Sequence, residues 1–252
     1  MSACRVSSRT SYFPPFKDNL HMQVPCFNIL RLKAKPLGPV VTYVKSDFDE
    51  EDLKRLGSDI RSLTDSEEYS IFSMTRNGRN LTFMGTGSGS PSLLTALFEV
   101  YSSNISALVR IGACGGLNET RVGEIIVCNS TYCMDKVSST LAGASETFPD
   151  SGLSADIVKS LLNDRVEARA ASNVSVDAMY LFEANIDQAE RDRVSCWDLE
   201  TATVLAFGRK FRIRAASVLE VVSDRGNNSS LTYPPLRRLD HVKTILDMLT
   251  RT

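Results

Sequence analysis

Two glycine-rich segments contain the residues whose types and spacing are best suited to chemistry. Gly85 to Gly89 follows a run typical of a strand and precedes a run with helical spacing. A loop of this kind turns its backbone N–H groups, and the start of the helix, toward a negatively charged ligand. In the second segment Arg110 precedes a loop expected at Gly112 to Gly116, and an arginine at the end of a strand is suited to clamp an anion. Together the two segments favour a small anionic or sugar ligand.

Neither segment matches a nucleotide-cofactor site. A single glycine loop is about as typical of a tight structural turn as of a ligand site. The spacing of Gly85, Gly87 and Gly89 differs from the G-x-G-x-x-G pattern of dinucleotide-binding folds, and no Walker-type lysine follows. We therefore expect no cofactor.

The segments that must position these loops alternate between strand-like and helix-like patterns, which predicts a mixed, largely buried sheet in an α/β sandwich. Asn77-Gly78 is a strong signal for a hairpin turn. The remaining strands are expected at 39–44, 107–112, 123–130 and 215–224, and the helices at 49–63, 93–103, 154–164, 198–211 and 240–252. We assign residues 27–252 to one domain and residues 1–26 to an N-terminal tail.

Composition argues against several classes of partner. The chain has 252 residues with 29 basic and 30 acidic side chains, so we expect no nucleic-acid partner and no membrane partner. Six cysteines without a C-x-x-C pair, and only two histidines, indicate no metal site and a reducing compartment, for which we expect the cytoplasm. Residues 1–17 are basic and serine-rich, which also suits a mitochondrial transit peptide, but we favour a frayed tail.

A series of motifs, in order along the chain, resembles the nucleoside phosphorylases of the uridine and hexameric purine type. Residues 85–92 resemble S-T-G-I-G-G-P-S, residues 110–117 resemble R-I-G-T-x-G-x-x, and 122–124 resemble V-G-D. Residues 175–180 are similar to S-S-D-x-F-Y, and 197–203 to Y-E-M-E-S-A-T. This resemblance implies a three-layer αβα sandwich with a mixed central sheet and oligomers built from dimers.

The resemblance also implies roles for individual residues in phosphorolysis, which exchanges a base for phosphate at the anomeric carbon of ribose. Arg110 and Gly87 would bind phosphate, and Glu200 would accept the ribose hydroxyls with Leu199 against the sugar. The base would be contacted and activated by three further residues: Met179, Asp224 and Arg225. Alternatively, Glu200 is a solvated carboxylate at a helix end, and Asp224 and Arg225 form an ordinary surface ion pair.

Much of the phosphate site implied by the resemblance is replaced. When the chain is aligned with the family's G-D-P-x-R loop, Ser46 stands at the position of the glycine and Glu50 at that of the arginine. Glu67 stands at the position of a second arginine. The signature hydroxyl falls on Ala113 and a ribose-contacting histidine on Asn28. Each arginine-to-glutamate exchange turns an attraction of roughly 3 kcal/mol at about 5 Å into repulsion. We therefore expect phosphorolysis to be impaired or lost.

Three hypotheses follow from this pattern. The first is a non-catalytic paralogue that binds a nucleoside or other ribose ligand, as a homo-oligomer or as a heteromer with an active family member. The second is a phosphate-independent nucleosidase, with Glu50 or Glu51 activating water and Asp224 as the acid. The third is an active phosphorylase, cleaving uridine or a purine nucleoside, whose anion site is rebuilt with Lys45 or Arg76.

Overall fold

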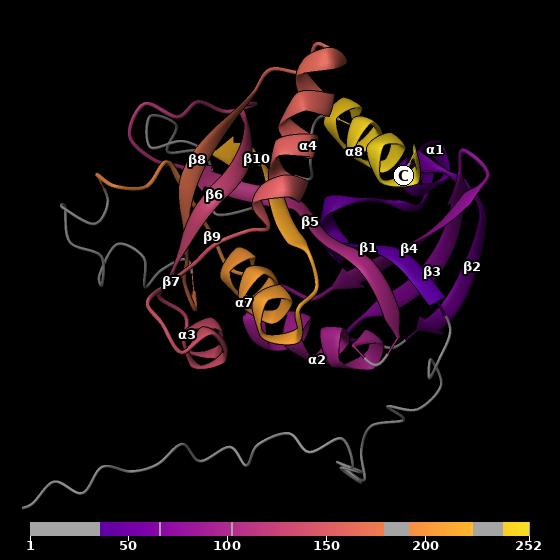
Figure 1. The fold of residues 1–252 in the computed structure, drawn as a ribbon, viewed down its shortest axis with the longest axis horizontal. Coiled ribbons are helices and arrows are strands. Elements are labelled where there is room, and N and C mark those ends of the chain that lie inside the picture. The colour runs from indigo at the N-terminus through magenta and orange to yellow at the C-terminus, as the bar shows by residue number, and fades with distance from the viewer. Residues whose placement is uncertain (1–35, 66, 102, 179–191, 224–238, 252) are drawn as a thin grey trace, which may run out of the picture. The chain divides into compact units, whose positions relative to one another are not determined.

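The computed structural model describes residues 36–65, 67–101, 103–178, 192–223 and 239–251, and within them ten strands form one mixed sheet (Figure 1). The strands are β1 Pro36–Val44, β2 Ser58–Asp65, β3 Ser70–Arg76, β4 Arg79–Thr86, β5 Asn104–Gly116, β6 Ile125–Cys133, β7 Glu146–Thr147, β8 Ala168–Ser175, β9 Cys196–Asp198 and β10 Ala215–Ser223. The helices are the 3-10 turn η1 Lys45–Asp47, α1 Glu50–Leu56, α2 Ser90–Val100, α3 Lys136–Ala142, α4 Ser151–Asn163, α7 Thr201–Phe211 and α8 Asp240–Arg251. No helix among these is long and apolar enough to cross a bilayer.

The centre of the sheet is parallel and one side of it closes on itself. Strand β1 lies between β4 and β5 and runs parallel to both. Strand β5 also pairs with β10, and the order β10-β6-β8-β9-β5 returns to it, so these five strands form a closed ring. On the other side β3 and β2 extend the sheet in antiparallel fashion. The ends of β1, β4 and β5, which carry the predicted site residues, therefore lie at the same edge of the sheet.

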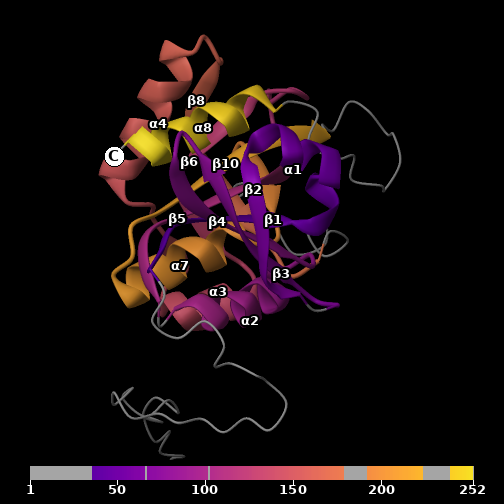
Figure 2. The same ribbon diagram turned by 90° about the vertical axis from the view of Figure 1, so that its right-hand side faces the viewer.

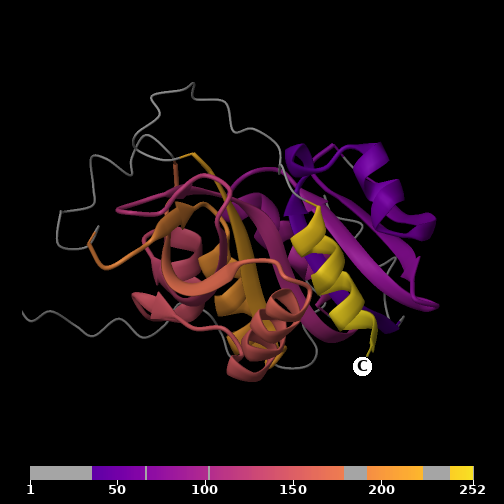
Figure 3. The same cartoon turned by 90° about the horizontal axis from the view of Figure 1, so that it is seen from above.

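Helices cover both faces of the sheet. One apolar core joins the strands to α4 and α8, and a second joins them to α2 and α7. Figures 1 and 2 show α4 and α8 on one side of the strands, with α2, α3 and α7 on the other, and Figure 3 views the molecule from the α4 and α8 side. Alternate residues of β1 serve the two cores, Val41 the first and Val40 the second, which explains its continuous apolar run. The predicted three-layer αβα sandwich with a mixed central sheet is confirmed.

Two expectations about local structure are wrong. The helix expected at 49–63 ends at Leu56, and Ser58 begins β2. Gly57 lies between them, where an added Cβ would be 2.6 Å from the Met74 side chain, so only glycine lets the chain turn this close to β3. The second glycine segment is not a loop, because Gly112 to Gly116 continue β5 and pair with β10 and β9.

The hairpin around Asn77-Gly78 is confirmed. Arg76 and Arg79 are paired across the turn, and both central residues have positive φ values, 51° for Asn77 and 73° for Gly78. These values match a type I′ turn, which fits the right-handed twist of the two strands. The turn is also held to α8, because Asn77 donates a hydrogen bond to Asp247.

Candidate functional site

Arg110 is the centre of the candidate site. It lies within β5, between Thr42 of β1 and Ser217 of β10, and its side chain is only 2% exposed. Gly112 lies two residues further along the same face of the strand. A Cβ at Gly112 would be 2.7 Å from an Arg110 guanidinium nitrogen, so glycine provides the space in which the guanidinium lies.

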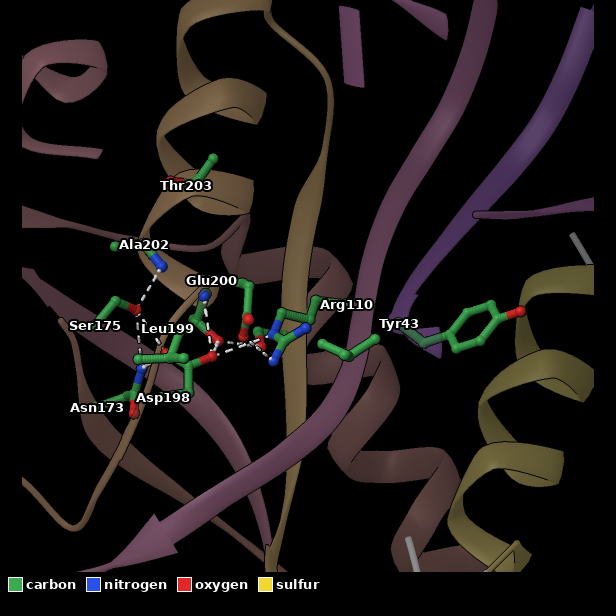
Figure 4. Close-up of polar contacts among 12 residues, drawn as sticks. Tyr43, Arg110, Asn173, Ser175, Asp198, Leu199, Glu200, Ala202 and Thr203 are labelled. Atoms are coloured by element: carbon green, nitrogen blue, oxygen red, sulfur yellow. Dashed lines mark hydrogen bonds and ion pairs between the residues drawn. The ribbon is translucent and has the colours of Figure 1, made fainter. Parts of the chain in front are cut away.

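Two buried carboxylates bind the Arg110 guanidinium (Figure 4). Its Nε donates to Asp198 Oδ2 at 3.1 Å, and its Nη2 donates to Glu200 Oε2 at 2.6 Å. Asp198 ends β9 and Glu200 precedes the first residue of α7, so one short segment supplies both. Their negative charges raise the pKa of Arg110 above its ordinary value despite its burial. The guanidinium is permanently charged, and its Nε and Nη2 atoms both donate to carboxylates of the protein itself.

Asp198 is fixed by four further hydrogen bonds. Its Oδ1 accepts from Asn173 Nδ2 at 2.9 Å and from Ser175 Oγ at 2.6 Å. Its Oδ2 accepts from Thr201 N at 3.0 Å and from Thr201 Oγ1 at 2.6 Å. Ser175 Oγ accepts in turn from Ala202 N at 2.9 Å. Asp198 therefore ties β8 and the start of α7 to Arg110, and it positions the guanidinium.

Glu200 connects Arg110 to the first glycine loop. Its Oε1 accepts a 2.6 Å hydrogen bond from the backbone N–H of Gly89, the residue that precedes α2. Burial raises the pKa of Glu200 to about 7, although Arg110 lowers it, and Asp198 raises it further. Glu200 is 3% exposed, so the alternative of a solvated carboxylate at a helix end is wrong.

A third buried carboxyl group, that of Asp47, interacts electrostatically with the same arginine. It lies in η1 at the end of β1, is 5% exposed, and accepts a hydrogen bond from Val44 N at 3.2 Å. Burial raises the pKa of Asp47 to about 6, Arg110 lowers it, and Glu220 of β10 raises it. Burial and Asp47 together raise the pKa of Tyr43 to about 12. One guanidinium thus binds two carboxylates and interacts electrostatically with the carboxyl group of a third residue, Asp47.

The raised pKa of Asp47 predicts a specific pH dependence of stability. Between pH 4 and 6 the Asp47 carboxyl group is protonated in the folded protein but ionised in the unfolded chain. Protonation of Asp47 therefore stabilises the folded wild-type protein fully below pH 4, and this stabilisation is lost as the pH rises through 6. A shift of about two pKa units corresponds to about 3 kcal/mol. We expect the free energy of unfolding of Asp47→Asn, relative to wild type, to increase by about that amount from pH 4 to pH 7.5.

Urea unfolding followed by the fluorescence of Trp197, the single tryptophan, measures this difference. Asp156→Asn, which removes an exposed carboxylate of α4, is the matched control. A difference between Asp47→Asn and wild type that stays constant over this range would contradict the prediction.

The first glycine loop already uses one of its predicted donors. Gly87 N donates to Glu68 O at 3.1 Å and to Ser92 Oγ at 3.0 Å. Ser90 Oγ donates to Leu199 O at 2.9 Å, so the loop is bound directly to the segment that carries Glu200. Leu199 packs against an apolar cluster that includes Leu117. The structure therefore brings Arg110, Leu199 and Glu200 together beside the loop, with the Gly87 N–H bonded within the chain.

The positions at which the sequence predicts a replaced phosphate ligand are mostly at the surface. Ser46, Glu50 and Glu67 are exposed, and Glu50 pairs with Lys54 on the outer side of α1 at 3.8 Å with its side chain 90% exposed. Ala113 is buried in an apolar core. Asn28, Met179, Asp224 and Arg225 lie outside the described residues, so their predicted roles stay predictions.

The residues considered for a rebuilt anion site differ in position. Arg76 binds Asp247 of α8 through two hydrogen bonds, of 2.6 and 2.9 Å, and donates to Leu56 O. It pairs with Arg79 at the start of β4, roughly 20 Å along that strand from the glycine loop, so Arg76 is not part of the site. Lys45 is close to the loop, and its Nζ donates to Glu67 O at 3.3 Å.

Sequence reasoning missed Asp198 and Asp47 as site residues. Asp198 carried a usable signal, because it precedes Glu200 by two residues and alternate residues of an extended segment share a face. Asp47 follows a strand-like run directly, as site residues at strand ends often do. Its burial and its proximity to Arg110 depend on contacts that no local pattern reveals.

The two hollows found on the described part of the chain lie away from this site. One hollow of about 480 Å³ lies between α4 and the β6 and β8 strands, and another of about 530 Å³ lies beside the end of α7. Neither is lined by Arg110, Asp198 or Glu200. The buried charge cluster is the candidate site. A fully desolvated guanidinium that interacts with three carboxyl groups is a stronger indication of a functional site than an open hollow.

Residues 40–238 match the family model described as the phosphorylase superfamily. The chain is 25% identical over 169 residues to a guanosine phosphorylase of Halorubrum lacusprofundi, covering 66% of this chain and 70% of that protein. It is 21% identical over 216 residues to a uridine phosphorylase of Thermococcus kodakarensis, covering 78% of each. A DeoD-type purine nucleoside phosphorylase of Geobacillus stearothermophilus is 24% identical over 156 residues, covering 60% of this chain and 66% of that protein.

The fold is similar to that of a solved uridine phosphorylase from Vibrio fischeri ES114. The TM-score is 0.73 at 21% identity, covering 86% of this chain and 94% of that chain. The same enzyme in complex with 6-hydroxy-1-naphthoic acid also gives a TM-score of 0.73. At this identity the likeness extends to the fold alone.

Proposed function

The chain belongs to the phosphorylase superfamily, and on that premise we propose that it binds a nucleoside, or another ribose-containing small molecule, with phosphorolysis impaired or lost. The observation that carries the proposal is the engagement of Arg110 by Asp198 and Glu200. Phosphate bound through Nε or Nη2 of this arginine would have to displace a buried carboxylate, and it would also experience the charge of Asp47. Each such encounter between like charges is unfavourable in a desolvated site.

The ribose part of the proposal is supported by Glu200. Each of its oxygens accepts one hydrogen bond, from Arg110 or from Gly89 N, whereas a carboxylate has about four acceptor positions. Two positions therefore remain for a pair of ribose hydroxyls. Leu199 would lie against the sugar, and Met179, Asp224 and Arg225 would contact the base.

The test is to incubate the purified full chain with uridine, inosine or methylthioadenosine, with and without phosphate. We expect no phosphate-dependent release of base above background. A bound nucleoside at about ten times its Kd adds about 1.4 kcal/mol to stability, which raises the melting temperature by roughly 3 to 5 °C. Glu200→Gln is expected to reduce this rise. Release that requires phosphate would refute the proposal and support an active phosphorylase.

One observation favours phosphate-independent hydrolysis as a second candidate. Asp47, and not Glu50 or Glu51, is the buried carboxyl group after β1, and its pKa of about 6 suits proton transfer near neutral pH. Asp47 would accept a proton from water, and Asp224 would act as the acid. Base release without phosphate that disappears in Asp47→Asn would support this candidate.

We also propose a cytoplasmic protein that forms a dimer-based homo-oligomer or a heteromer with an active family member. This proposal rests on the family resemblance for the assembly and on the six cysteines without a C-x-x-C pair for the compartment. Light scattering of the purified chain, and co-purification from its own cells, distinguish the two assemblies.

A further inference from the structure

The geometry around Glu200 is that of an oxyanion site filled by the chain's own carboxylate. One oxygen of Glu200 accepts from Arg110 Nη2 and the other from Gly89 N, each at 2.6 Å. A guanidinium combined with an N–H at the start of a helix is a common receptor for oxyanions. Gly89 precedes the 11-residue helix α2 and has a φ of 93°, a conformation that favours glycine.

Because Glu200 is attached to the same protein, it competes with an external oxyanion at a high effective concentration. We propose that Glu200 is the resident anion of the site and determines the charge of the ligand that the site accepts. While Glu200 is ionised it excludes oxyanions, and when it is neutral it releases Arg110 and the Gly89 N–H to one. This inference concerns the site of the proposed function and rests on that function for its link to a ribose ligand.

The groups that act on Glu200 come from several elements. Arg110 of β5 favours its ionised form, whereas Asp198 of β9 and Asp47 of η1 favour its neutral form, and Gly89 donates to it from the start of α2. Asp47 in turn faces Glu220 of β10. Burial adds to the effect of the neighbouring acids, so the pKa of Glu200 is about 7. Its charge therefore changes within the pH range in which the protein can be studied.

The test is a calorimetric titration of the full chain with sulfate at pH 5.5 and pH 8, at constant ionic strength. Sulfate keeps its charge over this range, so any change belongs to the protein. We expect the sulfate Kd of the wild-type chain to be at least tenfold lower at pH 5.5 than at pH 8. At pH 8, Glu200→Gln should bind sulfate at least tenfold more tightly than wild type, and its Kd should depend less on pH.

Glu99→Gln is the matched control. Glu99 lies in α2 and is buried like Glu200, but its carboxyl group accepts a hydrogen bond from Tyr69, whereas that of Glu200 accepts one from Arg110. The control variant should bind sulfate as wild type does. The double variant Arg110→Met, Glu200→Gln should lose the gain. Equal Kd values for Glu200→Gln and wild type, or an equal gain in Glu99→Gln, would overturn the proposal.

If Glu200→Gln does not fold, the sulfate Kd of the wild-type chain at pH 5.5 and pH 8 tests the proposal by itself. A sulfate Kd that is the same at both pH values overturns it. The outcome is separate from that of the proposed function, because the titration contains no nucleoside. A chain that binds nucleosides but shows no effect of Glu200 on sulfate would refute this inference alone. A chain that shows the sulfate effect but binds no nucleoside would refute the proposed function alone.

Discussion

Replacing Arg110 by methionine is expected to lower the free energy of unfolding by about 3 to 5 kcal/mol at pH 7.5. The reason is that Asp198 and Glu200, 1% and 4% exposed at their side chains, would remain buried without their counter-charge. A buried ion pair adds little stability compared with a pair of neutral groups in the same place. Removing only one of its partners is strongly destabilising, because the other charge stays buried without compensation. The loss should decrease at lower pH, where Glu200 becomes protonated.

Urea unfolding followed by Trp197 fluorescence measures this loss. Arg76→Met is the matched control, because its ion pair with Asp247 is 17% and 24% exposed, and its loss should be about 1 to 2 kcal/mol. If Arg110→Met does not fold, the triple variant with Asp198→Asn and Glu200→Gln should fold, since it removes the charges of both carboxylates that bond to Arg110. Equal losses in Arg110→Met and Arg76→Met would contradict the expectation.

A loss of similar size, about 3 to 5 kcal/mol, is expected for Asp198→Ala. This substitution leaves the buried donors of Asn173, Ser175 and Thr201 without their acceptor. Each unsatisfied buried donor costs about 1 to 3 kcal/mol, and relaxation makes the sum smaller than its parts. Asp198→Asn, which keeps one acceptor oxygen and loses the charge, should lose less.

The control for Asp198→Ala is Asp150→Ala. Asp150 also accepts from a helix-start N–H, that of Leu153 at 2.7 Å, but it caps α4 away from Arg110. Its loss should be about 1 kcal/mol. A loss in Asp198→Ala no larger than in Asp150→Ala would show that the network around Asp198 adds nothing beyond a helix cap.

Much of the fold could be predicted from sequence because its signals are local. The Asn77-Gly78 turn, the periodic helices and the apolar run of β1 are each set by neighbouring residues, and the structure has all three. The two local errors involved glycines whose role is set by distant contacts. Gly57 ends α1 in close contact with Met74. Gly115 lies in β5 directly against the Trp197 indole, where any larger residue would collide with the ring.

The sequence by itself determined the layered architecture and the order of the motifs, and it predicts that Glu50 and Glu67 stand in place of arginines. Only the tertiary structure decided what became of Arg110. Its partners Asp198 and Glu200 are 88 and 90 residues away along the chain, and a third carboxyl group, that of Asp47 at the end of β1, acts on it electrostatically. Burial and pKa depend on this convergence, because desolvation acts on groups only when the folded chain removes water from around them. The arginine that the sequence predicts as a phosphate ligand is, in the structure, bonded to two carboxylates of the same chain.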